Sequence, residues 1–178
     1  VAVTAHRGAS MQAPENSLAA FREAHEAGAH YVELDVQRTS DGAIIVIHDG
    51  DLMRMGNDPR KVKDLTLAEI RTVDIGSKRG PQYAGEHVPT LAEVIDYARG
   101  KFRINIELKY NVPDPQLAAA VLALLREKQF LDQVVITSLD HASLQQVEQL
   151  QPGLETGLIV TAAVGNVLKT DTDFVSLS

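Results

Sequence analysis

Side chains suited to metal or phosphate chemistry lie at the ends of four short apolar runs: His6-Arg7, Glu33 with Asp35, His48-Asp49, and Glu107 with Lys109. Residues two apart in a strand point to the same face, so each spaced pair presents two charges together. Carboxylates directed into a fold are costly unless they are paired or bind a metal. Glu33, Asp35 and Glu107 together would suit a hard divalent cation, which prefers oxygen ligands.

These positions also have a simpler explanation. A single His or Glu at the end of a strand more often belongs to a solvated rim, and Glu33 and Asp35 could face water from an edge strand. Their neighbours Val32, Leu34 and Val36 argue against this explanation, because they would then supply the only buried face of the strand.

His48 can be placed near these carboxylates without choosing a topology. Residues 40–43, Ser-Asp-Gly-Ala, are a turn signal, and a hairpin there would pair Asp35 with His48. The alternative is a crossover without a helix, in which residues 36–42 span at most about 23–25 Å. Either route leaves His48 close to the carboxylates.

The elements that must position these side chains alternate between strand-like and helical patterns, which favours an α/β fold. Several strand-like runs are almost continuous Val, Ile and Leu, as in strands that are covered on both faces. We predict strands at residues 1–6, 31–38, 43–48, 103–109, 134–139, 155–160 and 174–178.

Helix start signals lie between these strands. Thr66 with Glu69 and Thr90 with Glu93 have the spacing of capping boxes, in which each end of the pair satisfies a free backbone amide. We expect the remaining helices to start at Asn16, at Asp114 followed by Pro115, and at Asp140.

Residues 50–89 break the alternation, because they are polar and rich in Gly and Pro. A segment of this length with little regular structure is usually a functional loop or a small insertion. In a (β/α)8 barrel it would follow the third strand and cover the catalytic face, where the carboxyl ends of the strands converge. Seven strands fit such a barrel without its last units, and they also fit an open doubly wound sheet.

The bulk properties suit one domain, with 178 residues, 44% hydrophobic and 23% charged. The absence of cysteine excludes a disulfide framework and a thiolate metal site. A net charge of −7 argues against nucleic-acid binding, and it would repel an anionic substrate unless a bound cation reverses the local field. The longest apolar run, residues 117–125, is too short to cross a bilayer, although a membrane tether could lie outside the chain. The sequence does not indicate a compartment.

The ordered motifs resemble those of the glycerophosphodiester phosphodiesterase family, one of the phosphoinositide phospholipase C-like barrel phosphodiesterases. The matching elements are His6-Arg7-Gly8, Pro14-Glu15-Asn16-Ser17, Glu33-Leu34-Asp35-Val36, Thr39-Ser40-Asp41-Gly42, His48-Asp49, Pro89-Thr90-Leu91 and Glu107-Leu108-Lys109. The match runs from Val3 to about Leu139.

The resemblance implies a TIM-type (β/α)8 barrel with residues 50–89 as a small insertion after the third strand. It also implies that Glu33, Asp35 and Glu107 bind one divalent metal ion, Ca²⁺ or Mg²⁺. The family's barrel continues through a strand that contains Trp and a final strand, whereas this chain has no Trp. We therefore expect residues 1–178 to be a single catalytic barrel domain that is incomplete at its C-terminal end.

The resemblance implies further roles for individual residues. His6 and His48 would be the general acid and base, Arg7 and Lys109 would contact the phosphate, and Glu15 would bind the metal or lie beside its ligands. The other histidines match no catalytic element and are expected to be structural or exposed: His25, His30, His87 and His141.

The function implied is hydrolysis of glycerophosphodiesters, which are small molecules, to glycerol 3-phosphate and an alcohol. One alternative is a phospholipase D-like lyase or hydrolase that acts on a lysophospholipid or a sphingolipid. Another is a non-catalytic domain that keeps the pocket to bind a phosphodiester. Two titratable histidines argue against the binding domain, because binding alone needs no proton carriers.

Overall fold

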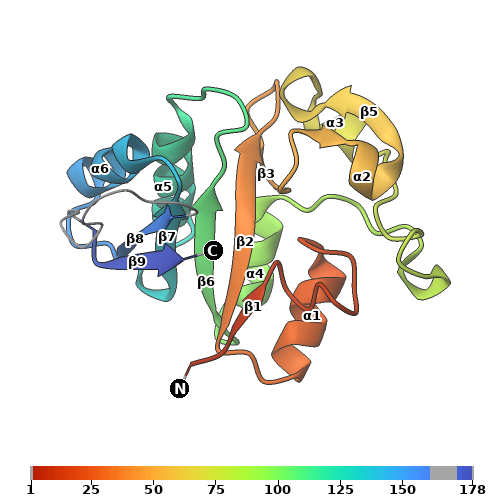
Figure 1. Cartoon of the computed structure of the whole chain (residues 1–178), viewed down its shortest axis with the longest axis horizontal. Coiled ribbons are helices and arrows are strands. Elements are labelled where there is room, and N and C mark those ends of the chain that lie inside the picture. The colour runs from red at the N-terminus through yellow and green to blue at the C-terminus, as the bar shows by residue number, and fades with distance from the viewer. Residues whose placement is uncertain (1, 161–171, 178) are drawn as a thin grey trace.

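Six parallel strands form one curled sheet in the computed structural model, which describes residues 2–160 and 172–177 (Figure 1). Their order in the sheet is β1-β2-β6-β7-β8-β9, so the strands follow one another in space as they do along the chain. They are Thr4–His6 (β1), Tyr31–Arg38 (β2), Arg103–Leu108 (β6), Val134–Ser138 (β7), Thr156–Val160 (β8) and Phe174–Leu177 (β9). The predicted strands are confirmed, with ends that differ by a few residues at most.

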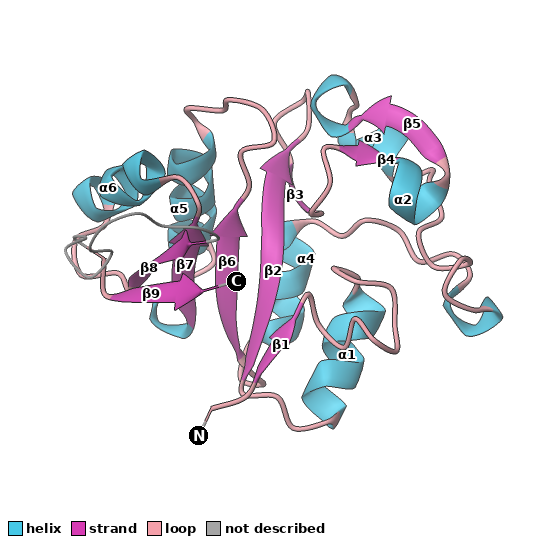
Figure 2. Cartoon of the chain, in the orientation of Figure 1, coloured by secondary structure: helices cyan, strands magenta, loops and turns pink. Residues whose placement is uncertain are grey.

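The helices that connect these strands pack on one face of the sheet (Figure 2). They are Leu18–Glu26 (α1), Leu91–Ala98 (α4), Leu117–Glu127 (α5) and His141–Leu150 (α6). Their apolar stripes share a buried cluster with the outward-facing residues of the strands, among them Leu34 and Ile106. In a doubly wound sheet helices cover both faces. Here the face opposite the helices carries Glu33, Asp35 and Glu107, so the sheet is a barrel wall and the doubly wound alternative is wrong.

Capping side chains explain where several helices begin. Both predicted capping boxes are confirmed, at α4 and at the short helix Leu67–Ile70 (α3). Asp140 caps α6, since its carboxylate accepts a hydrogen bond from the amide of Ser143 at 3.1 Å. These local rules hold because each cap needs only residues that are three positions apart.

Two predicted caps are wrong. The hydroxyl of Ser17, not the side chain of Asn16, accepts the hydrogen bond that starts α1. Asp114 precedes α5, but the helix begins at Leu117. The Asp114 carboxylate accepts a hydrogen bond from the amide of Gln116 at 3.1 Å and two more from Arg38, at 2.7 and 2.9 Å. At α1 a neighbouring hydroxyl takes the role expected of Asn16. Asp114 bonds the turn just before α5, and it also pairs with Arg38.

The third strand (β3, Ile44–Val46) runs antiparallel to β2 and lies off the parallel path of the sheet. The hairpin is therefore confirmed and the crossover is wrong. The partner of Asp35 is Ile47, whose amide donates to the Asp35 carbonyl at 2.9 Å, one residue earlier than predicted. His48 follows directly, and its carbonyl accepts a hydrogen bond from the side-chain amide of Gln37 on β2 at 3.1 Å.

Residues 50–89 contain more regular structure than the predicted single helix. Their elements are the paired strands Asp51–Leu52 (β4) and Asp58–Lys61 (β5), the helices Met53–Gly56 (α2) and α3, and 3-10 turns at Val62–Asp64 and Pro81–Tyr83. The segment has its own buried cluster, formed by Ile45, Ile47, Leu52, Val62, Leu65, Ile70, Val73, Ile75 and Val88. Among residues 2–160 and 172–177, no helix has the length and apolar character that a bilayer span requires.

The outward face of β2 should carry a large part of the stability. Leu34 is fully buried in the main cluster, so Leu34→Ala should lower the free energy of unfolding by about 2–5 kcal/mol. Leu150 is 42% exposed, and Leu150→Ala should change the free energy of unfolding by less than about 0.5 kcal/mol. Urea denaturation measures both values. Equal losses from the two variants would contradict the assignment of β2 to the core.

Candidate active site

Glu33, Asp35 and Glu107 form a cluster of carboxylates on the inner face of the sheet. The strand register places Asp35 beside Glu107 and Glu33 beside His6. One carboxylate oxygen from each residue lies within 4.8 Å of the others, and the residues are only 7%, 0% and 8% exposed. The predicted trio is thus brought together by two neighbouring strands.

The chemistry of this cluster fits a bound cation. Oε1 of Glu33 and Oδ1 of Asp35 are buried and accept no hydrogen bond. Burial, followed by the charge of Asp35, raises the pKa of Glu33 to about 8, although the backbone amide of Arg7 opposes the shift. Buried oxygens without donors carry a free-energy cost that a divalent cation with oxygen ligands would remove. Ca²⁺ and Mg²⁺ are both of this type.

Two residues with left-handed backbone conformations hold the cluster from the loop after β1. Arg7 has φ of 57°, which aims its amide at Oε2 of Glu33 at 2.9 Å. Asn16 has φ of 56°, and its side-chain amide donates to Oδ2 of Asp35 at 2.9 Å. Non-glycine residues rarely adopt this conformation, and such strain collects at functional sites. The role of Asn16 was missed; its position in the Glu15-Asn16 motif was the only signal in the sequence.

The two predicted phosphate-binding cations lie against the carboxylates. Nε of Arg7 is 3.2 Å from Oδ2 of Asp35. Nζ of Lys109 is 2.8 Å from Oε1 of Glu107 and 3.7 Å from Oδ1 of Asp35, and its side chain is 11% exposed. Both cations offset negative charge in the cluster and lie beside the place where a cation would bind.

The two predicted catalytic histidines differ in their surroundings. His6 is exposed over 69% of its side chain, with Nε2 3.8 Å from Oε2 of Glu33. Partial burial, followed by the charge of Arg7, lowers its pKa below 6.5, which favours a neutral ring that can accept a proton. His48 is less exposed, and its Nδ1 lies 2.8 Å from Oδ1 of Asp49. With Nδ1 donating to the carboxylate, Nε2 of His48 is the nitrogen left for a substrate.

Glu15 contacts guanidinium groups. It accepts a hydrogen bond from Arg7 at 3.1 Å and two from Arg54, at 2.8 and 2.7 Å. These contacts place Glu15 one side chain away from Asp35, through Arg7. Arg54 comes from residues 50–89 and was not identified from the sequence, because nothing local links it to the motifs.

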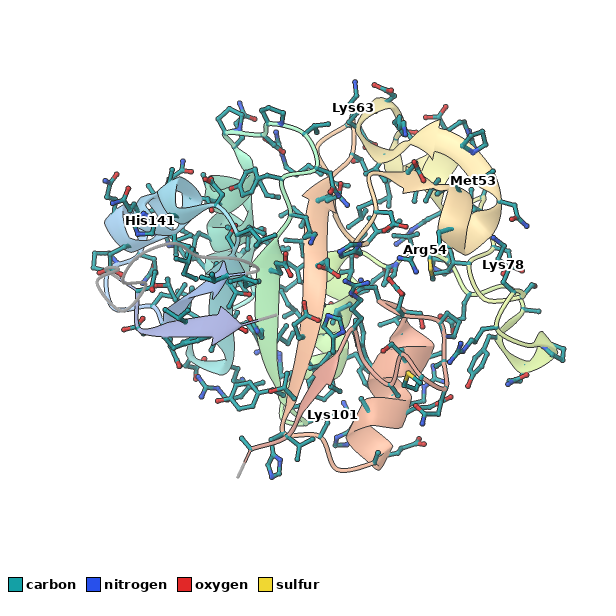
Figure 3. All side chains as sticks on the ribbon, viewed as in Figure 1. Met53, Arg54, Lys63, Lys78, Lys101 and His141 are labelled. Atoms are coloured by element: carbon teal, nitrogen blue, oxygen red, sulfur yellow. The ribbon has the colours of Figure 1, made fainter. Side chains whose placement is uncertain are left out.

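Three of the four remaining histidines have surroundings that are distinct from this cluster. His25 packs 6.0 Å from the ring of Phe102, and His30 accepts a hydrogen bond from the amide of Val3. His141 lies on α6, across the molecule from residues 50–89 (Figure 3). The expectation that these three are structural or exposed agrees with their surroundings.

A parallel sheet with helices outside and an acidic centre on its inner face is the architecture of an α/β barrel protein, and the centre could hold a metal ion. The chain belongs to the glycerophosphoryl diester phosphodiesterase family, whose model matches residues 6–176. This result confirms the family that the motifs indicate.

Individual relatives agree with this assignment. The chain is 43% identical over 159 residues to a glycerophosphodiester phosphodiesterase of Caldanaerobacter subterraneus, covering 88% of this chain and 65% of that protein. It is 38% identical over 176 residues to one of Bacillus subtilis, covering 91% of this chain and 60% of that protein. The chain therefore spans less than two thirds of the length of these relatives.

Solved structures confirm the TIM-type barrel. An Oleispira antarctica phosphodiesterase in complex with its product sn-glycerol-3-phosphate matches with a TM-score of 0.90 and 30% identity, over 99% of this chain and 74% of that one. The glycerophosphodiester phosphodiesterase of Thermotoga maritima matches with a TM-score of 0.78 and 28% identity, over the same shares of each chain.

The metal-free protein should lose stability as the pH rises. Because the pKa of Glu33 is raised from 4.5 to about 8, the folded state keeps a proton that the unfolded state has already released between these values. The free energy of unfolding should therefore fall between about pH 5 and pH 8. Urea denaturation in EDTA measures this slope, and Ca²⁺ or Mg²⁺ should restore stability at the upper end.

Glu33→Gln should flatten the slope, because the variant carries no ionisable group at this position. Glu127→Gln, at an exposed site on α5, is the matched control and should keep the slope. A profile for Glu33→Gln that matches the wild-type profile would rule out Glu33 as its origin.

Proposed function

We propose that this chain contributes the catalytic centre of a metal-dependent glycerophosphodiesterase, which releases glycerol 3-phosphate and an alcohol. The observation that carries the proposal is the buried trio of carboxylates with two oxygens that accept no hydrogen bond. Membership of the family and the product complex of the Oleispira neighbour support the reaction class. Residues 50–89 would form one wall of the centre, through Arg54.

Glu33, Asp35 and Glu107 would hold one divalent cation, Ca²⁺ or Mg²⁺, which supplies stabilisation of negative charge on the phosphoryl oxygens when it is bound. Arg7 would offer its planar guanidinium to a non-bridging oxygen, and Lys109 would supply a point charge. Because both cations already face carboxylates, they are held in place before a substrate arrives.

The two histidines would carry the protons. One removes a proton from the attacking water as its oxygen bonds to phosphorus, and the other donates a proton to the alcohol oxygen as the bond from phosphorus to that oxygen breaks. In a two-step variant, a neighbouring glycerol hydroxyl loses its proton to one histidine and attacks phosphorus. The bond to the alcohol oxygen breaks, the other histidine protonates that oxygen, and a cyclic phosphate remains. Water then opens the ring, and His6 and His48 exchange roles.

Hydrolysis of glycerophosphocholine should require a divalent cation. EDTA should abolish release of glycerol 3-phosphate, and Ca²⁺ or Mg²⁺ should restore it; an enzymatic assay of the product measures both. Absence of product with every cation, from protein shown to be folded by circular dichroism, would refute the proposal. Hydrolysis of lysophospholipids alone would favour the phospholipase D-like alternative.

Loss of either proton carrier should abolish most of the turnover. His6→Ala and His48→Ala should each lower kcat by about 10²–10⁴-fold, the usual contribution of general acid–base catalysis. Folding should persist, because the two side chains are 69% and 30% exposed. His87→Ala, at a half-buried histidine outside the motifs, serves as the control. Near-normal turnover in either of the first two variants would remove that histidine from the mechanism.

A further inference from the structure

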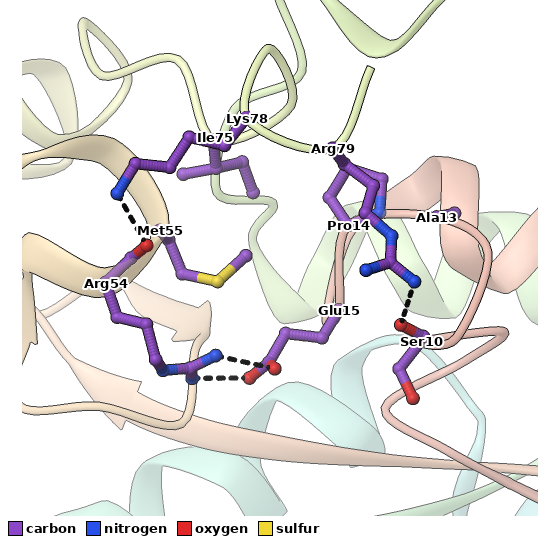
Figure 4. A pocket seen from close by; sticks show the side chains of 9 residues that line it. All are labelled: Ser10, Ala13, Pro14, Glu15, Arg54, Met55, Ile75, Lys78 and Arg79. Carbon is purple, nitrogen blue, oxygen red and sulfur yellow. Dashed lines mark hydrogen bonds and ion pairs between the residues drawn. The ribbon is translucent and has the colours of Figure 1, made fainter.

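Arg54 connects residues 50–89 to two acidic side chains, Glu15 and Asp49, and Figure 4 shows its contact with Glu15. Its Nη1 and Nη2 donate to the two oxygens of Glu15 at 2.8 and 2.7 Å, and its Nε donates to Oδ2 of Asp49 at 2.7 Å. A guanidinium is planar and cannot lose its charge, so it can fix two carboxylates in one orientation at the same time. A lysine in its place would lack the fork.

Asp49 transmits this constraint to His48. One oxygen of Asp49 accepts from Arg54, and the other lies 2.8 Å from Nδ1 of His48. Partial burial would raise the pKa of Asp49, but the hydrogen bonds from Arg54 and His48 outweigh it and lower the pKa. Asp49 therefore stays ionised, with each oxygen committed to one partner.

The main chain around His48 is held independently of Arg54. The side-chain amide of Gln37 donates to the carbonyls of Ile47, His48 and Asp49, at 2.9, 3.1 and 2.9 Å. Asn111 donates to the His48 carbonyl at 2.7 Å. With the backbone fixed, the orientation of the imidazole ring depends on Asp49.

Stability alone gives a weak reason for this arrangement. The Arg54 side chain is 48% exposed, and ion pairs at such sites contribute about 0–1 kcal/mol. Arg60, also in the segment 50–89, is 46% exposed and pairs with Asp58 through similar hydrogen bonds, yet within the described part of the chain Asp58 forms no hydrogen bond or ion pair with a histidine. The difference is that Asp49, which pairs with Arg54, also contacts the ring of His48.

We propose that Arg54 is a positioning residue for the reaction, which holds His48 through Asp49 so that the ring keeps Nδ1 protonated and presents Nε2 to the substrate. In this way residues 50–89 complete a centre whose other members come from the barrel strands, the loop after β1 and the chain that follows β3. The inference rests on the proposed function of His48, and it adds a residue to that function.

Kinetics should separate Arg54 from a merely structural residue. Arg54→Ala should lower kcat on glycerophosphocholine by about 10- to 100-fold and change KM by less than about twofold, because it disturbs proton transfer and not binding. Arg60→Ala, the matched control, should keep both constants. The double variant Arg54→Ala/His48→Ala should be no slower than His48→Ala, since a residue that acts through His48 has no further effect once the ring is gone. Additive losses, or normal kcat in Arg54→Ala, would overturn the proposal.

A spectroscopic measurement tests the same inference without turnover. In the wild-type protein, the ¹⁵N chemical shifts of His48 should report the Nδ1-protonated tautomer. In folded Arg54→Ala, they should report a mixture of the two neutral tautomers. An unchanged His48 spectrum in Arg54→Ala would overturn the positioning role even if the wild-type protein hydrolysed none of the substrates tried. Failure of the inference and failure of the proposed function therefore give different results.

Discussion

The arrangement of the centre depends on one electrostatic constraint, which is the burial of three carboxylates side by side. Glu33, Asp35 and Glu107 lie close together and are nearly excluded from water, so their negative charge needs opposite charge nearby. Arg7 and Lys109 supply part of this opposite charge, and two carboxylate oxygens still accept no hydrogen bond, which suits them to bind a cation. The left-handed turn at Arg7 is a consequence, because it brings a backbone amide to the same cluster.

Much of this could be predicted because a strand has a period of two. The bounds of β2 and the inward direction of Glu33 and Asp35 follow from alternation with Val32, Leu34 and Val36. The same alternation in β6 supplies Glu107, and parallel pairing then sets it beside Asp35. Capping boxes were predictable for a related reason, since both partners lie within one helical turn.

Features that depend on contacts between distant segments could not be predicted. Arg54 reaches Glu15 across 39 positions, and Arg38 reaches Asp114 across 76. The bond from Asn16 to Asp35 requires a backbone conformation that no local rule assigns to Asn16. Propensity and spacing describe neighbours along the chain, whereas these interactions are selected by the packing of whole elements.

The separate apolar cluster of residues 50–89 has a consequence for how the protein unfolds on heating. This cluster includes Ile45 and Ile47 from the hairpin, whereas the strands that carry the acidic trio belong to the main core. Elements with separate cores can open at different free energies. Partial melting of the smaller core would release His48 and Arg54 while the carboxylates keep their scaffold. Cation affinity and turnover would then have different thermal limits, and catalysis would be the more fragile property.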